Sequence, residues 1–257
     1  MGWIELDGAV NVRDLGGLPA DDGRQIAERR LLRGDNLQDL SPADVHLLVD
    51  ELGVTTVIDL RSPAEVTAEG PGPLTRLESV QHAYHPVLAE SGTATDAAAD
   101  ALAVRRDGAR SRYSDDLMCG HYLGYLEDRP AEVAAALRSI AQAGGAALVH
   151  CAAGKDRTGV VVALALSVAG VRRDAIVADY AATGERIGAV LGRLRSSETY
   201  AADLNSRPDS DHHPRAETMA AFLEVVDSRY GGALAWLAGY GFGAGDASLL
   251  RARLLDA

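Results

Sequence analysis

The fold is decided by Val149-His150-Cys151-Ala152-Ala153-Gly154-Lys155-Asp156-Arg157-Thr158-Gly159. The short apolar run 146–150 predicts a buried strand in front of a loop, and the apolar run 160–169 predicts a helix behind it. A loop in that position directs successive backbone N–H groups toward one point, where the N-terminal end of the helix adds its positive partial charge. The segment therefore predicts a nest for a tetrahedral oxyanion.

The side chains of this loop suit a nucleophile placed beside an oxyanion. Cys151 lies at the base of the predicted nest, where N–H donors favour the thiolate, which is a competent nucleophile near neutral pH. The planar guanidinium of Arg157 can hold two phosphoryl oxygens at once, which Lys cannot do. Thr158 is close enough in sequence to hydrogen-bond the cysteine sulfur. The residues expected to line the nest are Ala152, Ala153, Gly154 and Thr158.

Each of these features alone has an inert alternative. A buried cysteine at the end of a strand is often only a small apolar side chain, and a Gly-Lys-Asp-Arg loop is often only a polar turn. The spacing of Cys151 and Arg157 is common by chance. It gains force from His150 before the cysteine, from the Arg-Thr-Gly ending, and from the strand–loop–helix context.

Composition excludes several classes of protein. The 257 residues are 47% hydrophobic and 24% charged, which is typical of a soluble globular chain. A net charge of −12 argues against nucleic-acid binding, although a local pocket can still bind an anionic substrate. Two cysteines exclude a disulfide scaffold, and we expect neither a metal nor a cofactor. Without a visible signal or an integral membrane segment, we expect a cytoplasmic protein, and the Ala-, Gly- and Arg-rich composition suggests a bacterial one.

The remaining pattern predicts an α/β fold in one domain, 1–257. Its central sheet is small, mostly parallel and flanked by helices, and its C-terminal third is helical. Strands are predicted over 54–58 and near 80–84. Ser41 and Ser62 are expected to begin helices, the second with a capping box. Further helices are predicted over 113–127, 132–143, 174–180, 185–195, 214–230 and 246–255, and residues 91–110 are expected to form an exposed helix or a mobile insertion.

The loop 150–159 resembles the active-site loop of the bacterial tyrosine/serine protein phosphatase family. The string Asn11-Val12-Arg13-Asp14-Leu15-Gly16-Gly17 is similar to the family's N-terminal motif. Further similar strings are 31–35, 58–62, 176–180 and 228–232, so the resemblance spans residues 7 to about 250. It implies a cysteine-dependent phosphatase fold, with Cys151 as nucleophile and Arg157 as phosphate clamp. It also implies that Lys155 and Asp156 belong to the substrate-binding loop, and that residues 91–127 form a lid.

The general acid is less clearly marked in the sequence. Residues 85–90 contain no Asp where the family often has one, and Gly184 stands where the family often has Asn. Asp156 is the carboxylate best placed by position, and its alternative roles are orienting Arg157 or capping the helix. The other acids available are Asp59, Asp96, Asp100, Asp115 and Asp116.

Four residues outside the loop are candidates for a supporting role, together with His150 beside the nucleophile. Arg13 and Asp14 are expected to brace the loop, the alternative being a surface salt bridge of little energetic value. Asp59 and Arg61 follow a predicted strand, at the end where α/β sheets bind ligands, although Asp59 could equally cap a turn.

Two other features favour structural roles. His212 and His213 are adjacent in a polar loop, and adjacent histidines rarely bind one metal ion. Cys119 is expected to make a hydrophobic contact in a helix. It could be a redox partner of Cys151 only if their Cα atoms came within ~7 Å.

Three functions agree with the sequence. The leading hypothesis is a phosphatase of phosphotyrosine proteins that forms a phosphocysteine, with activity on phosphoserine, phosphothreonine or phosphoinositides. The second is a phosphatase of a small phosphoester such as a sugar, nucleotide or inositol phosphate. The third is an inactive phosphate-binding module, which the presence of both Cys151 and Arg157 disfavours. The sequence indicates no oligomeric state.

Overall fold

The computed structural model describes residues 2–88, 116–206 and 208–256, which contain a six-stranded sheet in the order β1-β2-β3-β6-β4-β5. Its parallel centre consists of β3 (Leu31–Gly34), β6 (Ala146–His150), β4 (Val54–Asp59) and β5 (Gln81–Tyr84). Its antiparallel edge consists of β2 (Arg13–Asp14) and β1 (Gly2–Trp3). The predicted small, mostly parallel sheet is confirmed.

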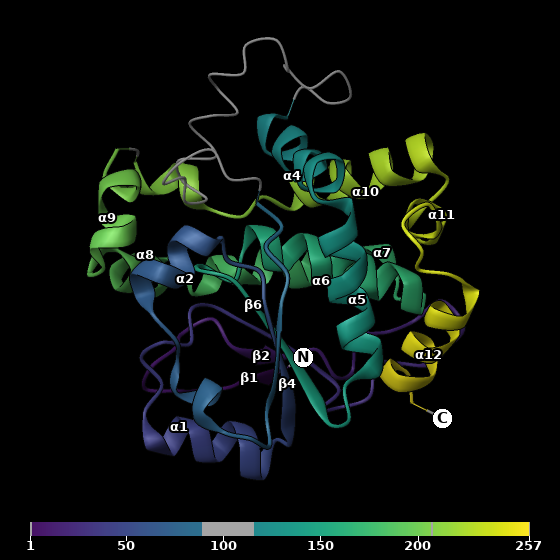
Figure 1. The fold of residues 1–257 in the computed structure, drawn as a ribbon. Helices are drawn as coiled ribbons and strands as arrows, with labels where there is room; N and C mark the ends of the chain where they lie inside the picture. The colour runs from purple at the N-terminus through teal and green to yellow at the C-terminus, as the bar shows by residue number, and fades with distance from the viewer. Residues whose placement is uncertain (1, 89–115, 207, 257) are drawn as a thin grey trace.

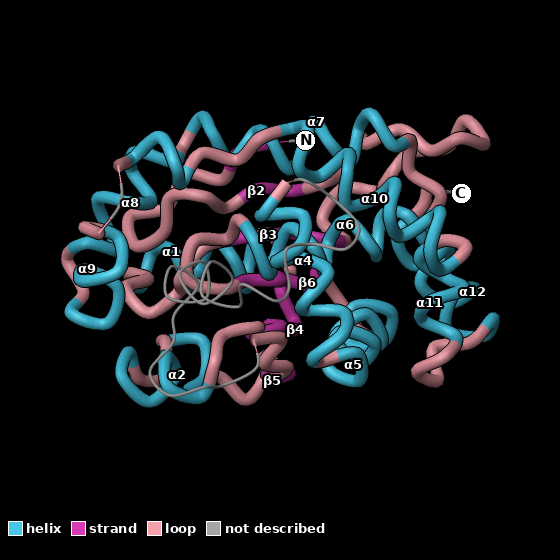
Figure 2. Tube along the Cα trace, turned by 90° about the horizontal axis from the view of Figure 1, so that it is seen from above, coloured by secondary structure: helices cyan, strands magenta, loops and turns pink. Residues whose placement is uncertain are grey.

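Helices cover both faces of the sheet (Figures 1 and 2). Successive side chains of a strand point to opposite faces, so Val149 of β6 enters one hydrophobic core and Leu148 enters the other. The larger core is built with α4 (Leu117–Asp128), α5 (Pro130–Gln142), α6 (Asp156–Ala169), α7 (Arg173–Ala182), α10 (Ala216–Tyr230), α11 (Ala233–Ala238) and α12 (Ala244–Leu254). The smaller core is closed by η1, a π-helix (Leu47–Glu51) that continues α1 (Pro42–His46).

The helix that follows the loop is buried on nearly all sides. Every residue of α6 from Asp156 to Leu166 is buried, which explains why its sequence is apolar all round. It begins four residues earlier than the predicted start at Val160. The reason is that neighbouring elements cover its polar first turn, so the loop residues Asp156, Arg157 and Thr158 already belong to the helix.

Two predicted helix starts are confirmed by their caps. The Ser41 hydroxyl accepts a hydrogen bond from Asp44 N, and the Asp44 carboxylate accepts one from Ser41 N. The same reciprocal pair joins Ser62 and Glu65 at the start of α2 (Pro63–Glu69). Each pair satisfies backbone donors that a helix leaves without intrahelical partners.

The C-terminal third is helical, as predicted. Besides α10 to α12 it contains η3 (Thr183–Glu185), α8 (Ile187–Arg195), α9 (Glu198–Leu204) and η4 (Asp209–His212). The one- to two-turn helices α9, α11 and η2 (Pro73–Arg76) were not predicted, because so few residues show no clear period. Among the described residues, the helices are too short or too polar to cross a membrane.

The predicted helix over 113–127 begins at Leu117, where Asp116 caps α4. The expected insertion 91–110 lies outside the described residues. Of the expected lid 91–127, the described part is mostly α4, whose Tyr122, Leu123 and Leu126 are buried in the larger core.

Candidate active site

Residues 151–155 form the turn between β6 and α6, at the C-terminal end of the parallel strands. The side chains of Cys151 and Arg157, at the two ends of the motif, are both fully buried. Gly154 has a φ of 67°, and a Cβ placed there would lie 2.5 Å from the carbonyl oxygen of Gly34. The loop can therefore pack against the end of β3 only because this position is glycine.

Three consecutive carbonyls of the turn are bound from outside it. The oxygens of Ala152, Ala153 and Gly154 accept hydrogen bonds from Asn36 N (2.9 Å), Asn11 Nδ2 (2.9 Å) and Arg33 Nη2 (2.7 Å). In a trans peptide the N–H group points opposite to the carbonyl of the preceding residue. The N–H groups of residues 153–155 consequently face the inside of the turn, which is the arrangement expected of an anion nest.

A charge-paired network supports the turn from behind. The Asp179 carboxylate accepts hydrogen bonds from Arg33 Nη1 (2.6 Å) and Arg13 Nε (2.8 Å), and all three side chains are buried. Burial alone would raise the pKa of Asp179, but the guanidinium groups of Arg33 and Arg13 hold it below its usual value. Arg13 also donates to Asn11 Oδ1 at 2.7 Å, and the Asn11 amide holds the Ala153 carbonyl. Arg13 therefore braces the turn through Asn11.

Asp14, the other residue expected to brace the loop, lies in a different environment. Its carboxylate accepts hydrogen bonds from the backbone N–H groups of Gly16 (2.9 Å) and Arg29 (2.8 Å). These contacts shape the segment between β2 and β3. Of the two residues expected to brace the loop, Arg13 connects to the turn and Asp14 does not.

The guanidinium of Arg157 is fixed by a buried carboxylate. Nη1 and Nη2 of Arg157 donate to Oε2 and Oε1 of Glu65 at 2.5 and 2.8 Å. Burial alone would raise the pKa of Glu65, but the charge and hydrogen bonds of Arg157 hold it below its usual value. Glu65 is itself held by Ser62 N in the capping box of α2. The fork of Arg157 therefore has one orientation, set by the start of a helix.

Lys155 and Asp156 have partners outside the turn. Lys155 Nζ donates to the carbonyl of His212 in η4 at 2.8 Å and lies 3.5 Å from Asp156 Oδ2. Asp156 Oδ1 accepts a hydrogen bond of 2.5 Å from the hydroxyl of Tyr122 in α4. No side-chain cap is formed at the N-terminus of α6, so the alternative role of Asp156 as a helix cap is not present in this structure.

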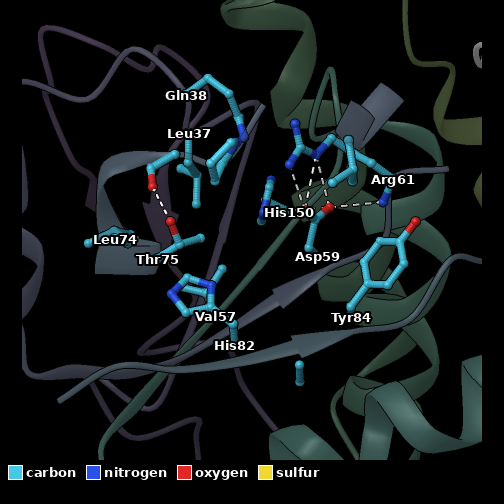
Figure 3. A pocket seen from close by; sticks show the side chains of 14 residues that line it. Leu37, Gln38, Val57, Asp59, Arg61, Leu74, Thr75, His82, Tyr84 and His150 are labelled. Carbon is cyan, nitrogen blue, oxygen red and sulfur yellow. Dashed lines mark hydrogen bonds and ion pairs between the residues drawn. The ribbon is translucent and has the colours of Figure 1, made fainter. Parts of the chain in front are cut away.

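His150, Asp59 and Arg61 meet beside the turn. They line one end of a cavity of about 180 Å³ whose other walls include His82 and Tyr84 of β5 (Figure 3). Arg61 Nη2 donates to Asp59 Oδ2 at 2.6 Å, and His150 Nε2 lies 3.7 Å from Asp59 Oδ1. His150 Nδ1 lies 3.3 Å from the Cys151 carbonyl oxygen, so it must carry the hydrogen that bonds it.

Charge states in this group follow from its burial. Burial lowers the pKa of His150 to about 4, so the imidazole is neutral at neutral pH. Burial alone would raise the pKa of Asp59, but His150 and the hydrogen bonds from Arg61 lower it to about 2. Asp59 is therefore ionised and paired, which makes it unsuited to donate a proton as a general acid.

Other candidate residues have structural partners or none. The Thr158 hydroxyl is buried and has no hydrogen-bond partner among the described residues, so its expected bond to the Cys151 sulfur is not made in this structure. Asp116 caps α4 by accepting from the N–H groups of Met118 (2.9 Å) and Cys119 (3.2 Å). Cys119 is buried in the larger core, and it forms no disulfide with Cys151. The acids Asp96, Asp100 and Asp115 lie outside the described residues.

Potential metal ligands do not cluster in the described part of the chain. Across residues 2–88, 116–206 and 208–256, no three His, Cys, Asp or Glu side chains are grouped so as to hold a metal ion. His212 is buried, and its backbone carbonyl binds Lys155. The polar-loop interpretation of the His212–His213 pair thus gains a specific contact.

Comparison with known proteins decides the family. A model described as the tyrosine phosphatase family matches residues 4–256. The chain belongs to the tyrosine phosphatase family. The resemblance seen in the sequence is thereby confirmed, and this tyrosine phosphatase is a cysteine-dependent phosphoric monoester hydrolase.

Curated relatives agree with this assignment. The phosphatase is 31% identical to the triple specificity protein phosphatase PtpB of Mycobacterium tuberculosis, with 98% of each chain covered. It is 36% identical to a putative tyrosine-protein phosphatase of Cupriavidus necator, over 71% of this chain and 63% of that protein. The crystal structure of TpbA from P. aeruginosa matches 77% of this chain and 89% of that one at 15% identity. Its TM-score of 0.29 is too low to carry an argument.

Sequence patterns did not point to several residues of the candidate site. Glu65 was assigned only to a helix cap, and Arg33 and Asp179 were only letters in strings that resemble the family. Arg33 did carry a signal, because a charged residue inside the apolar strand Leu31–Gly34 must be paired when it is buried. Asn11 was only the first letter of the N-terminal string that resembles the family, and its partner lies 142 residues away along the chain. Tyr122 carried no signal, since its partner lies 34 residues away.

Proposed function

We propose that this phosphatase hydrolyses phosphotyrosine in proteins through a phosphocysteine on Cys151. The observation that carries the proposal is the outward binding of three successive carbonyls, which turns the N–H groups of residues 153–155 toward the inside of the turn. Those donors face the place where a phosphoryl group bound beside Cys151 would carry its negative charge. Donors that are fixed before the reaction stabilise developing charge without reorganisation.

In the first step the Cys151 thiolate attacks phosphorus, the S–P bond forms, and the ester P–O bond breaks. Arg157 binds the equatorial phosphoryl oxygens, with its orientation set by Glu65. In the second step water attacks phosphorus, the S–P bond breaks, and inorganic phosphate and the thiolate are released. Splitting the reaction in this way replaces one difficult displacement with two easier ones.

Asp156 is the proposed general acid. Its carboxyl group lies at the first residue of α6, next in sequence to Arg157, and it is almost completely buried. A phenoxide of ordinary basicity leaves slowly unless a proton reaches its oxygen as the P–O bond breaks. Asp59 is excluded from this role by its ion pair with Arg61. After the first step the Asp156 carboxylate can take a proton from the attacking water.

The range of substrates is the part of the proposal that depends on relatives. The name of the mycobacterial relative states triple specificity, and this chain covers 98% of that protein. We therefore propose that phosphoserine, phosphothreonine or phosphoinositide hydrolysis accompanies the tyrosine activity. A small sugar, nucleotide or inositol phosphate is the competing substrate class.

One experiment tests the nucleophile and the substrate class together. The wild-type enzyme is assayed for phosphate release from a phosphotyrosine peptide, a phosphoserine peptide, a phosphoinositide vesicle and glucose 6-phosphate. Acid quenching during turnover should trap phosphate on the Cys151 peptide. Cys151→Ser should be inactive, because a serine hydroxyl in the same place stays protonated. Cys119→Ser, at the other buried cysteine, is the matched control and should stay active.

Substantial activity of the Cys151→Ser enzyme would refute the mechanism. A wild-type enzyme that prefers glucose 6-phosphate to the phosphotyrosine peptide would refute the proposed substrate class.

A further inference from the structure

Three helices bring two phenols and one carboxylate together in the interior. Tyr122 comes from α4, Tyr180 from α7 and Asp156 from the first turn of α6. The Tyr122 hydroxyl lies 2.5 Å from Asp156 Oδ1 and 2.6 Å from the Tyr180 hydroxyl. These residues stand 34 and 58 positions apart from Tyr122 in the chain, so only the folded protein assembles the group.

The ring of Tyr122 is held on several sides by other aromatic rings. Tyr180 and Phe222 meet it edge-on, each with a centroid distance of 6.1 Å, and Tyr125 stacks on it at 6.1 Å. A ring packed in this way has one orientation, so its hydroxyl has one position. Burial, with the Asp156 charge as a second cause, raises the pKa of the Tyr122 phenol well above its usual value. Tyr122 therefore remains a hydrogen-bond donor at every working pH.

The hydrogens in this group can be assigned by counting. A phenol has one hydrogen to donate, and a carboxyl oxygen that bears no proton can only accept. Tyr122 must therefore give its hydrogen to Asp156 Oδ1, and the Tyr180 hydroxyl must donate to the Tyr122 oxygen. Asp156 Oδ1 thus accepts from the Tyr122 hydroxyl, whose oxygen in turn accepts from Tyr180.

The other carboxyl oxygen is in a different situation. Lys155 Nζ lies 3.5 Å from Asp156 Oδ2, which is longer than a charge-assisted hydrogen bond. The hydrogen bond of Lys155 goes instead to the His212 carbonyl at 2.8 Å. Oδ2 is consequently the oxygen that can carry a transferable proton.

We propose that Tyr122 is a positioning residue for the general acid: it fixes Asp156 through Oδ1, so that Oδ2 presents the proton to the leaving group. This inference rests on the proposed function, and within it on the assignment of Asp156. As the ester P–O bond breaks, the proton on Oδ2 moves to the departing oxygen, and Asp156 becomes a carboxylate whose Oδ1 still accepts from Tyr122. Water restores the proton in the second step, so no other reactant is needed.

The test compares two substrates that differ in their need for a proton. The nitrophenolate of nitrophenyl phosphate leaves without help, whereas the phenolate of phenyl phosphate needs protonation. Tyr122→Phe should keep kcat for nitrophenyl phosphate within about threefold and lower kcat for phenyl phosphate about tenfold or more. Tyr240→Phe is the matched control, because it removes a tyrosine hydroxyl outside this group, from a side chain that is 43% exposed. It should affect both substrates by less than about threefold.

A double-mutant cycle keeps the test specific. In an Asp156→Asn background, adding Tyr122→Phe should not lower kcat for phenyl phosphate further, because residue 156 no longer has a proton for Tyr122 to position. If Tyr122→Phe does not fold, Asp156→Glu tests the same contact from the other side. The longer side chain moves the carboxyl away from the fixed hydroxyl, and the selective loss on phenyl phosphate should reappear.

The possible failures are distinguishable. If the wild-type enzyme hydrolyses neither ester, the proposed function itself is wrong. If Asp156→Asn lowers kcat for nitrophenyl phosphate and for phenyl phosphate equally, the general acid is another residue. The positioning role of Tyr122 is then wrong as well. If Asp156→Asn lowers kcat selectively for phenyl phosphate but Tyr122→Phe does not, Asp156 remains the general acid and the positioning role of Tyr122 is overturned.

Discussion

Both terminal nitrogens of Arg157 donate to the two carboxylate oxygens of Glu65, and neither side chain is appreciably exposed. Glu65 also accepts from the backbone N–H of Ser62, so the same carboxylate caps α2 and orients Arg157. A helix cap that is visible in the sequence is thus also the support of Arg157, the proposed phosphate clamp.

Glu65→Gln should therefore damage both stability and catalysis. Gln can still accept from Ser62 N, but it leaves the Arg157 charge buried without its partner. Removing one member of a buried ion pair costs about 3–5 kcal/mol. We expect urea unfolding to show a loss of that order and kcat to fall more than tenfold. Asp44→Asn makes the same change from carboxylate to amide in the other capping box, away from Arg157, and should leave kcat unchanged.

Arg157→Lys keeps the positive charge and removes the planar guanidinium with its two terminal nitrogens. A single ammonium cannot bind Glu65 through two nitrogens and also follow the phosphoryl oxygens into the transition state. We expect kcat to fall on the order of 10²-fold or more. Steady-state assays on nitrophenyl phosphate measure this loss. A Lys variant within about threefold of wild type would assign Arg157 to loop structure alone.

Arg33→Lys tests the support behind the turn. Arg33 reaches Asp179 with Nη1 and the Gly154 carbonyl with Nη2, and one ammonium cannot reproduce that fork. We expect the Gly154 carbonyl to lose its fixed orientation, so that inorganic phosphate inhibits about tenfold more weakly. Arg29→Lys, at a solvent-exposed arginine, should not change inhibition. Equal inhibition of wild-type and Arg33→Lys enzymes would mean that the turn holds its shape without Arg33.

The buried neutral imidazole of His150 predicts acid sensitivity. Burial, together with the Arg61 and His82 charges and against the attraction of Asp59, lowers its pKa from 6.5 to about 4. The unfolded chain therefore binds a proton that the folded chain does not, and stability is lost as the pH falls from 6.5 toward 4. At pH 5 the loss from this group alone is about 2 kcal/mol. Asp59, with its pKa lowered to about 2, adds a further loss only below its ordinary value of 3.8.

Urea unfolding of wild type and His150→Asn at pH 7 and pH 5 measures the effect. Asn keeps a donor near the Cys151 carbonyl but binds no proton. The difference in unfolding free energy between the two pH values should shrink by about 2 kcal/mol in the variant. An unchanged difference would show that His150 takes up its proton in the folded protein as readily as in the unfolded chain.

Sequence patterns predicted those parts of the site whose signal is local. The strand 146–150, the loop and the cap at Ser62 are each contained in fewer than a dozen consecutive residues, and all are confirmed as structural elements. The partners of the loop could not be predicted, because they come from distant elements. Asn11 and Arg33 bind carbonyls more than 100 residues away, and which carbonyl each one meets depends on strand order. The start of α6 was placed late for a related reason, since its polar first turn is covered by other helices.

Arg253 of α12 has a consequence for how the enzyme is made in the cell. Its guanidinium donates to the carbonyls of Ala143 and Gly145, just before the strand that leads to Cys151, and Leu254 O accepts from Ala27 N near the start of β3. Chains emerge from the ribosome N-terminus first. Cys151 and Arg157 are therefore synthesised long before the residues that lock their strand in place. A ribosome-bound chain that already contains the whole H-C-A-A-G-K-D-R motif still lacks the contacts of Arg253 in front of β6. The contacts of α12 at the start of β6 can therefore form only after α12 has left the ribosome.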